Sequence, residues 1–202
     1  MRKSVTILLA LVLARDVAMA RWQTPVSQVP DRGRPTTPKD EMPLFEFDRY
    51  FDGGWTFEWD VPAGVLGPDD TIIGRTTYRH IEGDFYEAET QAKGTQGAFT
   101  IHEVIAFRKE AKTLTRYVTD SRGFGYLQTG TVGGDLGGYY SFNLTSAPFT
   151  HGGKSVRIKN TLYLVSPVQY KHTMTVSIDG GPFTNYGNAW WQKHKEATRG
   201  GR

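Results

Sequence analysis

Hydrophobic and polar side chains alternate in short segments across residues 55–193, and glycine-rich turns separate these segments. In residues 55–61, for example, an aromatic or aliphatic side chain occupies every second position. A period of two is typical of strands that bury one face. About ten such segments follow one another with short turns, which is typical of a meandering antiparallel sheet. We therefore predict an all-β fold, a single up-and-down β-barrel of about ten strands, which can hold a small ligand inside. The predicted strands cover residues 55–61, 72–81, 85–92, 99–108, 114–119, 125–132, 139–144, 155–165, 169–178 and 183–193.

A different pattern precedes the first strand. In residues 43–51 the apolar side chains Leu44, Phe47 and Phe51 have helical spacing, and Gly53 and Gly54 follow as a stop signal. This spacing predicts a short N-terminal helix that caps one end of the barrel, with its aromatic side chains serving as a plug.

The N-terminal residues have the pattern of an export signal. Arg2 and Lys3 precede a short apolar run, and the sequence Ala18-Met19-Ala20 fits a small-x-small cleavage site. The apolar run is too short to span a bilayer, so we expect no integral membrane insertion. We predict a signal peptide at 1–20, a flexible Pro-rich linker at 21–42, a barrel domain at 43–195 and a disordered tail at 196–202. The protein is then exported, and is periplasmic or secreted.

Charge and composition narrow the expected partners. The chain carries a net charge of +3, which falls to +1 when the predicted signal peptide, itself +2, is removed. A nearly neutral mature chain gives no electrostatic reason to expect nucleic acid. There is no cysteine, and hence no disulfide framework or thiol chemistry. The 11 Phe, 10 Tyr and 5 Trp suit strands and a barrel interior.

One motif resembles a known nucleic-acid-binding strand. Residues 122–129 nearly match the aromatic strand of an RNA-binding fold, but Thr129 stands where that motif needs an aromatic side chain. The two helices of that fold are also missing from the pattern. The five histidines show no metal-ligand spacing, so we predict neither RNA binding nor a metal site.

Period-two alternation selects the side chains that would line a cavity. His172 and Asn160 are polar residues on otherwise apolar strand faces, and Arg116 could join them as a group that orients a ligand. A hydrogen-bonded core histidine is the alternative interpretation of His172. Carboxylates such as Glu103 could serve acid–base chemistry if desolvated, or could lie on the solvated outer face. The predicted ligand-binding residues are Trp55, Phe57, Trp59, Arg116, Asn160, Leu162, His172, Met174 and Val176.

Three stretches resemble a family, the lipocalin-like (calycin-type) β-barrel proteins of unknown function, in particular the DUF1579-like type of exported bacterial proteins. These stretches are residues 51–58 with a G-x-W start, residues 117–123, and residues 177–183. The resemblance covers about residues 44–193, and it implies a barrel of about ten strands with an interior cavity but no agreed activity. Haem-binding relatives of this barrel use a histidine on a late strand. His172 is the nearest candidate but does not align, so we expect no cofactor.

Three functional hypotheses remain open from the sequence. The first is a non-enzymatic barrel that binds a small hydrophobic molecule in its interior. The second is a hydrolase or isomerase on the same barrel with His172 or a buried glutamate as base. The third is a structural or interaction protein with a filled barrel. A homodimer formed through an exposed strand face is also open.

Overall fold

The computed structural model describes residues 43–134 and 139–194. The predicted signal peptide, linker and C-terminal tail lie outside the described residues. In this part of the chain one short helix precedes the strands. The elements are α2 (Phe47–Phe51), β1 (Gly53–Val61), β2 (Asp70–Glu82), β3 (Phe85–Gly94), β4 (Gly97–Arg108), β5 (Thr113–Asp120), β6 (Phe124–Gly134), β7 (Tyr140–Ser146), β8 (Phe149–His151), β9 (Lys154–Ser166), β10 (Gln169–Ile178) and β11 (Thr184–Lys193).

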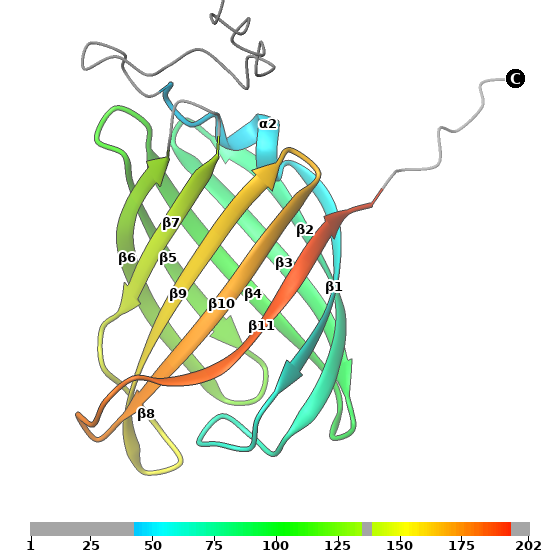
Figure 1. The fold of residues 1–202 in the computed structure, drawn as a ribbon, viewed down its shortest axis with the longest axis vertical. Helices are drawn as coiled ribbons and strands as arrows, with labels where there is room; N and C mark the ends of the chain where they lie inside the picture. Colours follow the sequence, from blue (N-terminus) through cyan, green and yellow to red (C-terminus); the bar gives the residue numbers. More distant parts are fainter. Residues whose placement is uncertain (1–42, 135–138, 195–202) are drawn as a thin grey trace, which may run out of the picture. The chain divides into compact units, whose positions relative to one another are not determined.

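Ten of these strands form a closed antiparallel barrel (Figure 1). Strands β1 to β7 pair in chain order, β7 pairs with β9, and β11 returns to pair with β1. The pairing of β9 with β10 completes the ring. Closure leaves no unpaired edge within the ring, so every barrel strand has two neighbours. The predicted all-β barrel is confirmed.

The short strand β8 was not predicted. It pairs with the beginning of β9, beside the stretch of β9 that pairs with β7. Ala147 and Pro148 separate β7 from β8, and the register on β9 shifts by one residue across this break. Proline has no N–H to give to a ladder, which is why one long strand is divided here.

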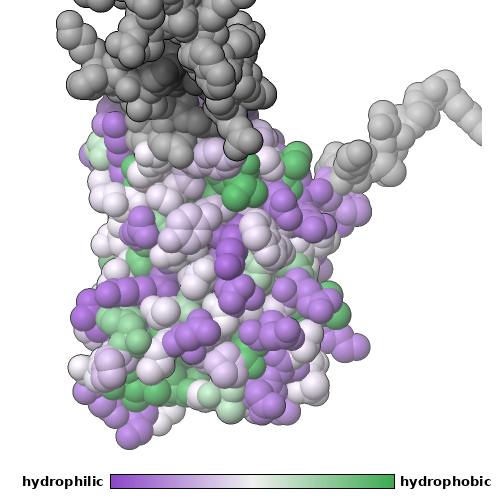
Figure 2. Space-filling view, in the orientation of Figure 1, coloured by the Kyte–Doolittle hydropathy of each residue, from purple (hydrophilic) through white to green (hydrophobic). Residues whose placement is uncertain are grey.

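The inward faces follow the alternation on most strands. Trp55 and Phe57 of β1 point inward, and so do the even-numbered residues from Val156 to Leu164 of β9 and from Tyr170 to Val176 of β10. On β3 and β4, where the sequence left both faces open, Tyr86 and Glu103 are on the inner face. The face drawn in Figure 2 is a mixture of hydrophilic residues, residues of intermediate hydropathy and scattered hydrophobic residues. Among the described residues, no helix is long and apolar enough to cross a membrane.

Helix α2 lies at one end of the barrel (Figure 1). Aromatic side chains of this segment form a plug that packs against the barrel core. We define the plug as Phe45, Phe47, Tyr50 and Phe51, all of which are buried. Phe45 lies 5.0 Å from Phe142, and Phe47 lies 4.1 Å from Tyr86, measured between ring centroids. Glu46 has an extended backbone, and α2 begins at Phe47. The predicted short helix with plugging aromatic side chains is present.

Candidate functional site

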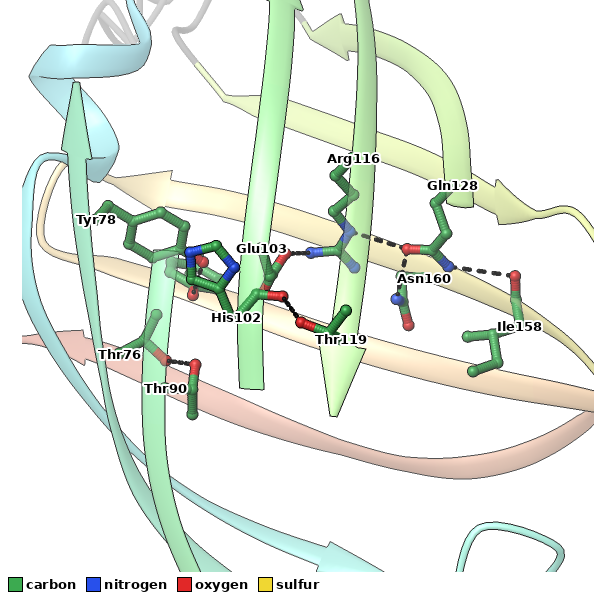
Figure 3. A network of polar contacts seen from close by, with 11 residues as sticks. Thr76, Tyr78, Thr90, His102, Glu103, Arg116, Thr119, Gln128, Ile158 and Asn160 are labelled. Carbon is green, nitrogen blue, oxygen red and sulfur yellow. Dashed lines mark hydrogen bonds and ion pairs between the residues drawn. The ribbon is translucent and has the colours of Figure 1, made fainter. Parts of the chain in front are cut away.

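A polar layer crosses the middle of the barrel (Figure 3). We define the layer as Glu103, Arg116, Gln128 and Asn160, on β4, β5, β6 and β9. Arg116 Nη1 donates to Glu103 Oε2 at 2.7 Å, and Arg116 Nε donates to Gln128 Oε1 at 2.9 Å. Asn160 Nδ2 donates to the same Gln128 oxygen at 3.1 Å. All four side chains are buried, so their charged and amide groups find most of their hydrogen-bond partners within the layer itself.

The charges in this layer are compensated. Burial works against the charge of Arg116, but the neighbouring Glu103 carboxylate raises the pKa of the guanidinium above its ordinary value. Tyr78 and Tyr170 lie close by, with their hydroxyl oxygens 3.2 Å apart. Burial raises the pKa of both phenols, and it raises that of Tyr126 to about 12. The tyrosines are therefore neutral at physiological pH.

A cavity lies in the half of the barrel away from the plug. The volume of the cavity is about 100 Å³. Aromatic and aliphatic side chains dominate its wall, and the polar layer contributes Glu103, Arg116 and Asn160. The cavity is lined by Phe57, Trp59, Val61, Leu66, Ile72, Thr76, Tyr78, Thr90, Phe99, Ile101, Glu103, Arg116, Val118, Asp120, Arg122, Phe124, Tyr126, Ile158, Asn160, Leu162, Tyr170, His172, Met174, Tyr186 and Trp191.

An ion pair lies in the part of the cavity wall that is shared with a second pocket. Both spaces are lined by Leu66, Phe99 and Arg122. The Arg122 guanidinium makes two hydrogen bonds to the buried Asp120 carboxylate, at 2.6 and 2.9 Å, and its central carbon lies 3.9 Å from the Phe99 ring centroid. We call Asp120, Arg122 and Phe99 the entrance. The charges of Asp120 and Arg122 are paired with each other, and the Arg122 side chain is partly exposed.

Three buried polar atoms have no hydrogen-bond partner among the described residues: Trp59 Nε1, Asn160 Oδ1 and His172 Nε2. The Trp59 nitrogen packs against Gly187, where a Cβ would lie only 2.6 Å from it and where φ is +103°. Only glycine fits that position without strain. Asn160 and His172 lie on adjacent strands, β9 and β10, so their two unpartnered atoms belong to the same part of the cavity wall.

His172 is held as a neutral imidazole. Its ring lies 5.1 Å from the rings of both Trp59 and Trp191. Burial, with a smaller contribution from the charge of Arg116, lowers its pKa to about 3. In the unfolded chain the imidazole of His172 takes up a proton near pH 6.5. In the folded protein the same imidazole takes up a proton only near pH 3. Stability from this residue is therefore complete above pH 6.5 and is lost as the pH falls towards 3.

We expect this effect to be measurable in a His172→Gln variant. Between pH 7 and pH 5 the wild type should lose about 2 kcal/mol more unfolding free energy than the variant, because a glutamine side chain does not titrate. Urea unfolding of both proteins at the two pH values measures the difference. An equal loss in the two proteins would contradict a buried, neutral His172.

The structure divides the predicted ligand-binding residues between two regions. Phe57, Trp59, Arg116, Asn160, Leu162, His172 and Met174 line the cavity. Trp55 is buried beside the plug instead, with its ring 4.9 Å from Tyr170 and its Nε1 donating to the Phe51 carbonyl at 2.8 Å. Val176 is buried but is not among the cavity-lining residues. That these lining residues bind a ligand is still a prediction.

Sequence reasoning missed several members of the site. Gln128 is fully buried and joins Arg116 to Asn160, yet Gln128 was not singled out. Its spacing of two residues from Tyr126 was an available signal for a shared inner face. For Glu103 the sequence left open a desolvated position and the solvated outer face, and the structure buries it, whereas Glu58, Glu87 and Glu89 are more exposed. The ion pair at the entrance stood out in the sequence only as part of a family motif.

The chemistry of the site favours binding over proton transfer. A general base works best with a pKa near the operating pH, and that of His172 is far below it. Glu103 is engaged by Arg116 at 2.7 Å. Within the described residues, no three histidine or carboxylate side chains gather into a metal-ligating group.

Comparison with known proteins supports the fold alone. No protein-family model matches the chain, and no curated protein matches it either. The crystal structure of Rv2717c from M. tuberculosis is similar with a TM-score of 0.60 and 10% identity, over 72% of this chain and 93% of that one. A redesigned β-barrel, mFAP0, bound to DFHBI, has a TM-score of 0.40 and 12% identity, over 72% and 99% of the two chains. The chain is thus similar to solved antiparallel barrels, and its DUF1579-like membership stays a prediction.

Proposed function

We propose that this protein is a non-enzymatic, lipocalin-like carrier or sensor barrel of the DUF1579-like type, which binds a small, largely hydrophobic molecule in its cavity. Export to the periplasm or the exterior is part of this proposal, and it rests on the N-terminal sequence pattern. The ligand would enter past Asp120, Arg122 and Phe99 and lie between the aromatic wall and the polar layer.

One observation carries the proposal: the two halves of the barrel interior are built differently. Around α2, aromatic side chains pack closely, with Phe45 within 5.0 Å of both Tyr50 and Phe142. The other half also has aromatic side chains on its wall, interspersed with smaller ones such as Thr76, Thr90 and Val118, and these side chains surround a cavity of about 100 Å³. Protein interiors are normally close-packed, and an unfilled cavity lowers stability. A barrel that only needed to be filled would not keep this space, whereas a binding protein needs it.

Filling the cavity should weaken binding. Ile101 lines the cavity from β4, whereas Val104 of the same strand is 40% exposed on the outer face. We expect Ile101→Trp to weaken binding of the uncharged fluorescent probe N-phenyl-1-naphthylamine by roughly tenfold or more, equivalent to about 1.4 kcal/mol. A fluorescence titration measures the affinity.

Val104→Trp is the matched control, because it adds the same side chain to the same strand outside the barrel. It should bind the probe as the wild type does. If Ile101→Trp binds the probe as tightly as Val104→Trp, the cavity is not the binding site. If the wild type binds no probe at all, the proposed function is wrong for this class of molecule.

A further inference from the structure

Arg116 fixes the orientation of two amide side chains in the polar layer. A guanidinium only donates hydrogen bonds, so the Gln128 atom that faces Arg116 Nε at 2.9 Å must be the carbonyl oxygen. Gln128 Nε2 then donates to the Ile158 carbonyl at 3.3 Å, which agrees with that orientation. The same Gln128 oxygen receives Asn160 Nδ2. The amide of Asn160 is therefore held with its oxygen on the side away from Gln128 (Figure 3).

This arrangement leaves Asn160 Oδ1 as a buried acceptor without a donor. Asn160 is only 2% exposed, and its oxygen has no partner among the described residues. Burying a polar atom without a hydrogen bond lowers the stability of the folded state, so such an atom needs an explanation. Because Asn160 lines the cavity, a bound molecule with a hydroxyl or N–H group could supply the missing donor.

His172 adds a second unpartnered atom to the same wall. Asn160 is paired with Met174 and His172 with Leu162, so the two polar residues are diagonal neighbours on the inner face. Diagonal neighbours on adjacent strands lie about 7–8 Å apart, which is within the span of a small molecule. The neutral imidazole can offer a donor or an acceptor to a ligand, and it brings no charge.

The charges of the cavity wall cancel in pairs. The charged residues that line it are Glu103 with Arg116 and Asp120 with Arg122, each pair joined by hydrogen bonds. No charged group of either sign is left over in the wall that the structure describes. An anionic or cationic ligand would lose its hydration without gaining an uncompensated opposite charge. An uncharged ligand does not meet this penalty.

We propose that the ligand is an uncharged, ring-containing molecule that donates a hydroxyl or N–H hydrogen bond to Asn160 Oδ1. This inference rests on the proposed function, and it adds the chemical class of the ligand to it. Carboxylates such as fatty acids are disfavoured by the same geometry. The aromatic rings of Trp59, Trp191 and Phe124 provide the surface against which the body of the ligand packs.

Three matched probes test the inference: 2-naphthol, 2-methoxynaphthalene and 2-naphthoate, titrated calorimetrically at pH 7 into the full folded protein. They share one ring system and differ in whether they donate a hydrogen bond and carry a charge. We expect 2-naphthol to bind roughly tenfold tighter than its methyl ether, because only the hydroxyl satisfies Asn160. We expect 2-naphthoate to bind more weakly than either.

The variant Asn160→Leu should remove the preference for 2-naphthol, and Asn143→Leu should keep it. Asn143 is the matched control, because it is exposed on the outer face of β7, the neighbour of β9. The wild-type comparison needs no substitution and therefore stands even if Asn160→Leu fails to fold. Equal binding of the naphthol and its ether, tighter binding of the naphthoate, or a preference that survives in Asn160→Leu would overturn the inference. Binding of the ether would still support the proposed function, whereas failure of all three probes would contradict both.

Discussion

Replacing Arg116 by methionine should lower the free energy of unfolding by about 3–5 kcal/mol, because it leaves a buried carboxylate without a counter-charge. Arg116 is 7% exposed and Glu103 is 8% exposed, and the two are joined by a 2.7 Å hydrogen bond. The substitution also removes the donor that orients Gln128. Chemical denaturation at pH 7 measures the loss.

Two further variants separate the ion pair from a general effect of mutating arginine. Arg108→Met changes an exposed arginine at the end of β4 and should shift stability by no more than about 0.5 kcal/mol. The double variant Arg116→Met/Glu103→Leu should recover much of the loss, because no unpaired charge remains buried. A loss below about 1 kcal/mol for Arg116→Met would show that water solvates Glu103, as at a surface ion pair.

The second large effect is expected at Trp55. Trp55→Ala should cost about 3–5 kcal/mol, since it removes a large side chain that is 1% exposed and leaves a cavity beside the plug. It also removes the indole donor to the Phe51 carbonyl at the end of α2. We therefore expect loosened packing of α2 as well, visible as reduced near-ultraviolet circular dichroism.

Trp190→Ala is the matched control for Trp55. Trp190 lies on β11, which pairs with β1, but its side chain is 44% exposed on the outer face. Its loss should cost far less than that of Trp55, about 1 kcal/mol or below, because little apolar surface is removed from a packed interior. Similar losses in the two variants would contradict the assignment of Trp55 to the closed end of the barrel.

Alternation predicted the barrel and its inner faces where one face was clearly apolar. On β10 the inner residues Tyr170, Met174 and Val176 share a face with His172, and this pattern was visible in the sequence. On β4 both faces carry apolar and polar residues, so the inward position of Glu103 could not be assigned. Glu103 and Arg116 become neighbours only through the pairing of β4 with β5, in which Ile105 is opposite Arg116. A single strand does not contain that information.

Depth along the barrel was the second feature that the sequence did not reveal. Period two states which face a residue occupies but not whether it lies in the plug or in the cavity. Trp55 and Trp59 are on the same face of β1, yet Trp59 lines the cavity and Trp55 packs beside the plug. The difference arises because the segment before β1 folds into one end of the barrel and fills only that half. Tertiary packing of residues 45–51 therefore decides where the candidate site lies.

Native mass spectrometry of the protein from its own host tests the central claim most directly, with wild type and Ile101→Trp measured side by side. The account predicts that the wild type carries an extra mass that is lost on denaturation, and that Ile101→Trp does not carry it. A wild-type protein at its bare mass, or an extra mass that Ile101→Trp retains, would contradict the account.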